Sequence, residues 1–176
     1  MATTDFKSQI AKCLVSSDSF KANMGPIREE LAAQKKETVK IFLDTISQII
    51  SDKKEAPTSR FYALYFLKIA TEHSNPMLVS YLFARKELLK TLEQQAAFDK
   101  DKKFPHRGAF FFSTSPADNE RATGNNYIAL ILEMIKYWDR KYGSTDSEGK
   151  DNAPRSLYKR LSEGQKVPFP ENFFYY

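Results

Sequence analysis

Cysteine, histidine and glycine are scarce in this 176-residue chain, and each scarcity narrows what the protein can do. The single cysteine, Cys13, cannot form an internal disulfide, which favours a reducing compartment such as the cytoplasm. His73 and His106 are the two histidines, so the sequence offers no cluster with metal-ligand spacing. Six glycines leave few positions for phosphate-binding or catalytic loops. We therefore expect neither a metal nor a cofactor.

Long apolar runs and catalytic motifs are also missing. No apolar run is long enough to span a membrane, and residues 1–9 carry an early aspartate and no signal-peptide core. The sequence contains no GxSxG, HExxH or Cys-x-x-Cys motif. A catalytic role for His73 is disfavoured because no nucleophile or orienting partner is suggested near it. We expect a protein that is not an enzyme.

The composition that remains is that of a soluble globular domain with a mild basic excess. Apolar residues make up 41% of the chain and charged residues 28%, with a net charge of +5. A basic surface favours acidic partners, such as a phospholipid surface or an acidic protein, although it can also be merely solvated. The glycine–aromatic signature of common RNA-binding sheets is absent, so no nucleic acid is expected as a partner.

The segment from Ser59 to Ala97 predicts two helices joined by a tight turn. Its first half, from Phe61 to Ala70, is apolar almost all the way round and is interrupted by Lys68 alone. A helix that is apolar on every face is surrounded by other helices. Asn75-Pro76 then predicts the start of the second helix. We expect the first helix to form the middle of an all-α domain.

The N-terminal part predicts further amphipathic helices. Thr4 to Val15 has one apolar face on which Cys13 is expected to pack into the core. This helix could instead lie on a membrane through Lys7 and Lys12. Gly25-Pro26 is expected to open the next helical region, and a clear apolar stripe begins at Val39. A turn is expected over residues 52–57.

The C-terminal half alternates between irregular segments and helices. Residues 98–125 are irregular and rich in phenylalanine, so this loop either covers an open end of the helices or binds a partner. Tyr127 to Tyr142 predicts a strong helix, with Gly143 in the left-handed position that ends it. A flexible loop is expected over residues 144–154, followed by a short helix that ends at Gly164.

The last four residues are all aromatic, and an exposed cluster of this kind would be sticky in a free monomer. The segment therefore either folds back onto its own domain or inserts into another protein, and the sequence leaves both open.

The two C-terminal helical segments resemble the closing helices of VHS domains, the α-superhelical modules of endosomal sorting adaptors. The resemblance is carried by a tryptophan near a helix end, a tyrosine-containing helix, a glycine and a Phe-Pro pair: Trp138, Tyr158, Leu161, Gly164, Phe169 and Pro170. The central helix is similar to the inner helix of the family at Ala63, Leu64 and Leu67. The resemblance implies a right-handed α-superhelix of seven or eight helices over residues 1–170, with an aromatic tail over 171–176. The related ENTH domains and RNA-polymerase-tail-binding domains share this fold.

The resemblance implies a protein-interaction module that acts as an adaptor in trafficking. The short chain and the aromatic tail favour instead a scaffold subunit of a large assembly, such as a ciliary or cytoskeletal one. Ubiquitin-binding members carry a tryptophan at the start of the second helix, whereas Trp138 lies elsewhere. The expected partners are other proteins in a multi-subunit complex, bound through aromatic anchors: Phe110, Phe111, Phe112, Phe173, Phe174, Tyr175 and Tyr176. The alternative is an ENTH-like phosphoinositide or membrane-binding module that uses four lysines: Lys7, Lys12, Lys35 and Lys36. A third hypothesis, recognition of a polymerase tail, predicts nuclear residence, and no clear nuclear-localisation run supports it.

Overall fold

The computed structural model describes residues 3–73, 75–97 and 116–170, with side chains described from residue 4 and, in the last range, from residue 126. In this part of the chain the regular elements are helices, and the one β-type pairing is an isolated bridge between Thr145 and Asp151. The predicted all-α class is confirmed. The chain divides into two compact units, Met1–Arg85 and Lys86–Tyr176. A single domain over residues 1–170 stays a prediction.

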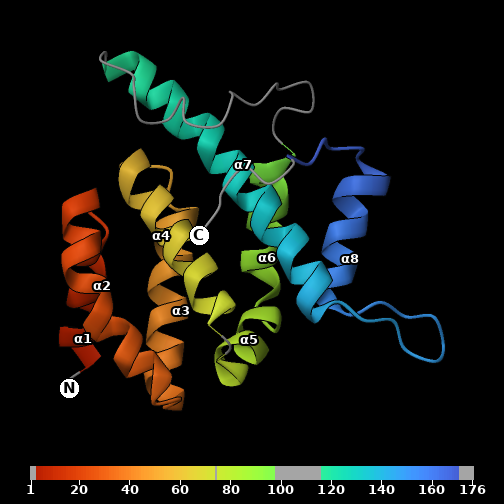
Figure 1. The fold of residues 1–176 in the computed structure, drawn as a ribbon, viewed down its shortest axis with the longest axis horizontal. Helices are drawn as coiled ribbons and strands as arrows, with labels where there is room; N and C mark the ends of the chain where they lie inside the picture. Colours follow the sequence, from red (N-terminus) through yellow and green to blue (C-terminus); the bar gives the residue numbers. More distant parts are fainter. Residues whose placement is uncertain (1–2, 74, 98–115, 171–176) are drawn as a thin grey trace. The chain divides into compact units, whose positions relative to one another are not determined.

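Five helices form the first unit (Figure 1). They are α1 (Thr3–Cys13), α2 (Ser17–Ala32), α3 (Lys36–Ser51), α4 (Pro57–Glu72) and α5 (Pro76–Phe83). Helix α1 packs against α2 and α3, and α3 in turn packs against α4 and α5. Most contacts therefore join helices that are next to each other or one apart in the sequence.

Helix α4 is buried on nearly all of its faces, as its sequence predicts. Residues from Phe61 to Thr71 are buried, apart from Tyr62 and Tyr65, which are half-buried. Lys68 is also buried, with 3% of its side chain exposed, and forms an ion pair with Glu72 one turn later. The Phe66 ring meets Phe42 of α3 edge-on, with the ring centroids 5.1 Å apart. Cys13 of α1 is fully buried, which confirms its expected core position.

The second unit is built on the long helix α7 (Pro116–Tyr142). Helix α6 (Lys86–Ala96) and helix α8 (Ala153–Lys159) both pack against α7, and a π-helical turn, η2 (Arg160–Gly164), continues α8. Trp138 of α7 is completely buried. The Arg160 guanidinium ties η2 to α6, because its Nε lies 3.1 and 3.2 Å from the two carboxylate oxygens of Glu93.

Several predicted helix boundaries differ from the structure. The helix predicted from Tyr127 begins at Pro116, so residues 116–125, expected to be irregular, are helical. Pro26 does not open a helix but lies inside α2, which begins nine residues earlier at Ser17. The start is fixed by Ser16, whose Oγ accepts a hydrogen bond from the Ser19 amide at 3.1 Å. The second member of the predicted hairpin is two helices, because the chain leaves the helix at Ala84 and Arg85. Arg85 there forms an ion pair with Asp44 of α3.

Gly143 also has a role that differs from the predicted one. It does not take a positive φ, whereas Gly149 does, at 80°. A Cβ atom on Gly143 would lie 2.3 Å from the carbonyl oxygen of Asp139. Glycine is therefore required at the end of α7 by a close approach of backbone atoms and not by a left-handed conformation.

Candidate functional site

The predicted aromatic anchors lie outside the described residues. This holds for the loop phenylalanines and for the C-terminal aromatics: Phe110, Phe111, Phe112, Phe173, Phe174, Tyr175 and Tyr176. Their assignment as partner-binding residues stays a prediction.

The four lysines of the membrane hypothesis lie in the first unit, and two of them come together. Lys35 and Lys36, at the start of α3, line a pocket of about 310 Å³ that Phe6 of α1 also lines. Glu30 and Glu37 line the same pocket, so the charges around it balance. Anionic headgroups are attracted by a net positive patch, and this pocket does not supply one.

The other two lysines of that set lie apart from this pocket. Lys7 Nζ is 3.4 Å from Oε1 of Gln48, near the far end of α3. Residues 36 and 48 are about 18 Å apart along the helix axis, at 1.5 Å per residue. Lys12 is exposed on α1. The four lysines are therefore spread along the first unit.

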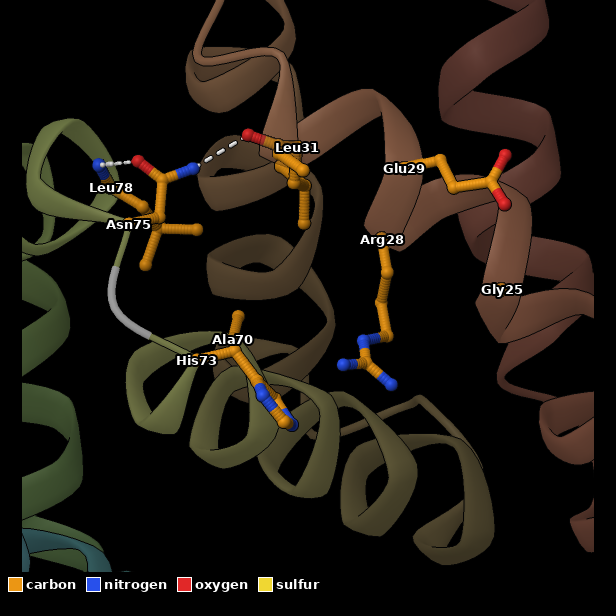
Figure 2. A pocket seen from close by; sticks show the side chains of 9 residues that line it. Gly25, Arg28, Glu29, Leu31, Ala70, His73, Asn75 and Leu78 are labelled. Carbon is orange, nitrogen blue, oxygen red and sulfur yellow. Dashed lines mark hydrogen bonds between the residues drawn. The ribbon is translucent and has the colours of Figure 1, made fainter.

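A larger concavity lies where the end of α2 meets the end of α4 and the start of α5. We call it the α2–α5 groove. It has a volume of about 460 Å³ and is lined by Gly25, Arg28, Glu29, Leu31, Ala32, Ala70, His73, Asn75 and Leu78. All of these residues belong to the first unit. Figure 2 shows the groove from close by.

The pattern of α2 explains how its residues divide between the core and the groove. Ile27 and Leu31 are one turn apart and turn towards the core, where both are buried. Arg28 and Ala32 form the neighbouring row, also one turn apart, and both line the groove. Arg28 is half-buried and Ala32 is exposed. One helix thus supplies both core contacts and the wall of the site.

Asn75 holds together the end of the groove nearest α5. Its Oδ1 accepts a hydrogen bond from the Leu78 amide at 3.0 Å, which caps α5, and its Nδ2 donates to the Leu31 carbonyl oxygen at 2.6 Å (Figure 2). The side chain is 8% exposed. A single buried amide therefore fixes the end of α2 against the start of α5.

Two basic side chains stand over the groove. Figure 2 shows the Arg28 side chain of α2 and the His73 side chain at the end of α4 extending to the same side of the groove, while the Glu29 carboxylate points away from both. His73 is the residue that ends α4, and it is exposed. No hydrogen bond or ion pair joins either basic side chain to another part of the chain that the structure describes. The groove therefore combines an apolar part with two basic groups that pair with no described residue.

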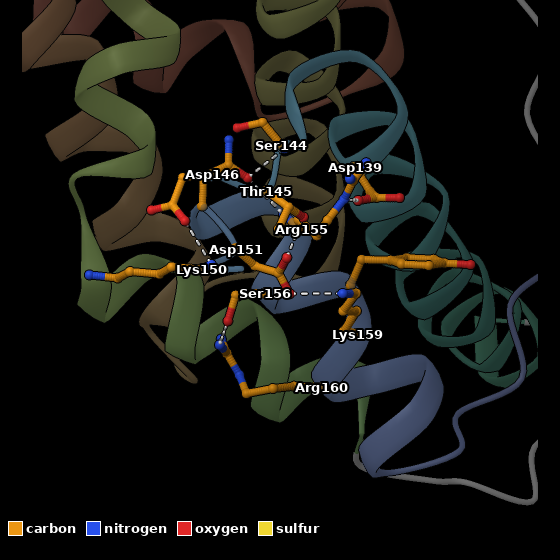
Figure 3. Close-up of polar contacts among 12 residues, drawn as sticks. Asp139, Ser144, Thr145, Asp146, Lys150, Asp151, Arg155, Ser156, Lys159 and Arg160 are labelled. Carbon is orange, nitrogen blue, oxygen red and sulfur yellow. Dashed lines mark hydrogen bonds and ion pairs between the residues drawn. The ribbon is translucent and has the colours of Figure 1, made fainter. Parts of the chain in front are cut away.

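The second unit carries a different polar cluster, in the loop between α7 and α8 (Figure 3). Asn152 Oδ1 accepts hydrogen bonds from the Ser144 and Arg155 amides, and its Nδ2 donates to the Tyr142 carbonyl oxygen at 2.7 Å. The Asp151 carboxylate accepts from Thr145 at 2.6 Å and pairs with Lys159 at 2.9 Å. These contacts lower the pKa of Asp151, the Thr145 hydrogen bond most of all.

This loop was expected to be flexible, yet its backbone is held by a short ladder. The Asp146 amide donates to the Lys150 carbonyl oxygen and the Asn152 amide to that of Ser144, at 2.9 and 3.0 Å. The cluster consists of charges that satisfy one another, so it contributes to the loop's shape more than to ligand binding.

The sequence indicates single parts of the α2–α5 groove but not that they come together in space. Asn75-Pro76 was recognised as a helix start, and both contacts of Asn75 lie at the groove. Arg28 was not singled out, because an arginine on an amphipathic helix gives no local signal of its tertiary surroundings. Among the described residues, no group of three or more His, Cys, Asp or Glu side chains could hold a metal ion.

The fold and site thus define an all-α protein with an open groove between helices. None of the described helices is long and apolar enough to cross a membrane. Comparison of the chain with protein-family models, curated proteins and solved structures found no match.

Proposed function

We propose that this chain is a non-enzymatic protein-interaction module with a VHS-like fold, acting in the cytoplasm as an adaptor or as a scaffold subunit of a larger assembly. The observation that carries the proposal is the α2–α5 groove, a concavity with an apolar floor and unpaired polar groups at its rim. Protein-binding sites combine an apolar centre with a polar rim in this way, and arginine is enriched in them.

The packing order of the helices supports the superhelical part of the proposal. In the first unit α1 packs on α2 and α3, and α3 packs on α4 and α5; in the second, α7 packs on α6 and α8. Contacts confined to near neighbours in the sequence are typical of α-solenoids. The burial of α4 on nearly all of its faces supports the proposal that it is an inner helix of such a superhelix.

The rigidity of the groove walls supports a binding role. The Leu31 end of α2 and the start of α5 are joined through Asn75, and α4 is held in the core by its buried faces. A wall that does not have to be ordered on binding lowers the entropic cost of association. The aromatic loop and tail remain proposed as additional anchors.

Membrane recognition through Lys7, Lys12, Lys35 and Lys36 is the alternative function. The observation in its favour is the small pocket that brings Lys35 and Lys36 together. The two glutamates at that pocket weigh against it. Flotation with phosphoinositide liposomes tests the alternative: binding that is lost in a K35E/K36E double variant and survives deletion of the tail would establish it.

Affinity purification with mass spectrometry tests the proposed function, using three forms of the full protein as bait. These are the wild type, the Ala32→Trp variant, in which a large ring fills the groove from an exposed position, and a chain truncated after Pro170. We expect a stoichiometric partner that the wild type retains and A32W loses. Loss only on truncation would move the site to the aromatic tail, and a partner retained by both variants would contradict the use of either surface.

A further inference from the structure

We infer that the α2–α5 groove binds an acidic side chain, aspartate or glutamate, in a protein partner, with the carboxylate held by Arg28 and His73 and an adjacent apolar residue on the floor. This inference rests on the proposed function, since it names the chemistry of the partner at that same groove.

The first step is the contrast between Arg28 and other arginines of the chain. Arg85, Arg155 and Arg160 each form an ion pair, with Asp44, Asp139 and Glu93 respectively. Arg28 forms none with any described residue, although it is half-buried. A guanidinium that has lost part of its hydration gains most from a carboxylate, which it can bind through two parallel hydrogen bonds.

The second step is that the neighbouring acidic residue does not fill this role. Glu29 follows Arg28 directly, and consecutive residues on a helix do not face each other. Its carboxylate points away from Arg28 and His73 (Figure 2). The Arg28 guanidinium therefore stays available to a group that enters from outside.

The α2–α5 groove also has an apolar part that a partner has to cover. Leu31, Ala32, Ala70 and Leu78 line the same groove as the two basic side chains and form its apolar part. The volume of about 460 Å³ lies within the range of ligand sites, and it has room for a carboxylate with a neighbouring apolar side chain. A small polar anion alone would leave this apolar surface uncovered, so the geometry favours an acidic residue next to an apolar one.

A phosphorylated residue is the less favoured occupant. Protein sites for phosphorylated residues usually gather several arginines around the dianion. The groove has one arginine and one histidine, so it lacks the several arginines that such sites gather.

The experiment uses the 176-residue chain and a display library of random, unphosphorylated twelve-residue peptides. The library is selected against the wild type, A32W, R28E and the matched control K53E, which reverses an exposed charge in the turn before α4. Groove-dependent peptides are those that the wild type and K53E retain and A32W loses. We expect them to be enriched in aspartate or glutamate beside an apolar residue. R28E should lower their affinity at least about tenfold, as befits loss of a charge-assisted pair, and H73Q should lower it less.

The outcomes separate the inference from the function on which it rests. Groove-dependent peptides without acidic enrichment, or with unchanged affinity for R28E, would overturn the inference and leave the groove as a binding site. A selection without groove-dependent peptides would overturn both. Circular dichroism establishes that each variant is folded, and R28Q replaces R28E if the charge reversal unfolds the protein.

Discussion

Two asparagines each join the ends of two helices through one side chain. Asn75 caps α5 and bonds the end of α2, while Asn152 caps α8 and bonds the end of α7. Asparagine suits both places because its amide accepts and donates at once. Serine and aspartate also cap helices, but neither can make the second bond by donating an amide hydrogen.

Replacing Asn75 by alanine is expected to destabilise the protein by about 2–3 kcal/mol, since it removes a helix cap and leaves the buried Leu31 carbonyl without this donor. Urea denaturation measures the free energy of unfolding. Asn75→Ser restores the cap alone and should recover about 1 kcal/mol of the loss. Equal stability of the alanine variant and the wild type would show that neither bond matters.

Cys13 gives a prediction about pH. Burial raises the pKa of its thiol to about 11, from a usual value of 9.0. The folded state therefore keeps the thiol proton above pH 9, where the unfolded state loses it. The protonated Cys13 thiol therefore makes its full contribution to the free energy of unfolding below pH 9. This contribution, about 3 kcal/mol in all, is lost as the pH rises from 9 to 11.

The comparison of the wild type with Cys13→Ala isolates this effect from other groups that titrate in the same range. We expect the stability advantage of the wild type to shrink as the pH rises from 8 to 11. An advantage that stays constant with pH would mean that the thiol titrates alike in both states. In the folded protein below pH 9 the thiol should also react slowly with iodoacetamide, because the thiolate is the reactive form.

At the scale of elements, α4 is the helix on which the first unit depends. The Phe66 ring is fully buried and packs edge-on against Phe42 and Phe20, with centroids 5.1 and 5.4 Å away. Phe66→Ala is expected to cost about 3–5 kcal/mol through the cavity it leaves. Phe66→Leu fills most of that space and should cost clearly less, as chemical denaturation would measure. Similar losses for both variants would point to the ring contacts and not to the cavity.

The contacts of Asp151 in the loop between α7 and α8 lead to a prediction about the pKa of its carboxyl group. The pKa of Asp151 lies below its usual value of 3.8, chiefly because the Thr145 hydroxyl donates to it and then because Lys159 lies beside it. This contribution to stability is present above that value and is lost as the pH falls through the lowered pKa. Carbon-detected NMR titration should show Thr145→Val raising the pKa of Asp151 more than Lys159→Met does. The reverse order would contradict the dominant role of the hydroxyl.

Most helices could be predicted from the sequence, because the positions that a helix buries recur at helical spacing and carry apolar residues. The all-round apolar pattern from Phe61 to Ala70 identified α4, and Asn75-Pro76 identified the start of α5. The errors lie where tertiary contacts override local signals. Pro26 reads as a helix start but is carried inside α2 by the buried residues on both sides of it. The break between α5 and α6 at Ala84 and Arg85 could not be predicted, because no glycine or proline lies there.

At the scale of the whole chain, the candidate site could not be predicted, because it is made by three helices that meet. Arg28 and His73 are 45 positions apart, and it is the folded chain that leaves Arg28 without a carboxylate partner among the described residues. The sequence directed attention instead to aromatic residues, since clusters of them are conspicuous in composition. Those residues lie outside the described part of the chain.

A protein partner is proposed to bind in the α2–α5 groove. Hydrogen–deuterium exchange of the full protein, with and without the purified stoichiometric partner, tests this most directly. We predict new protection of the backbone amides over the end of α2 and over residues 70–78, absent when A32W replaces the wild type. Protection from exchange that is confined to the second unit, or that is the same in A32W and the wild type, would contradict binding in the groove.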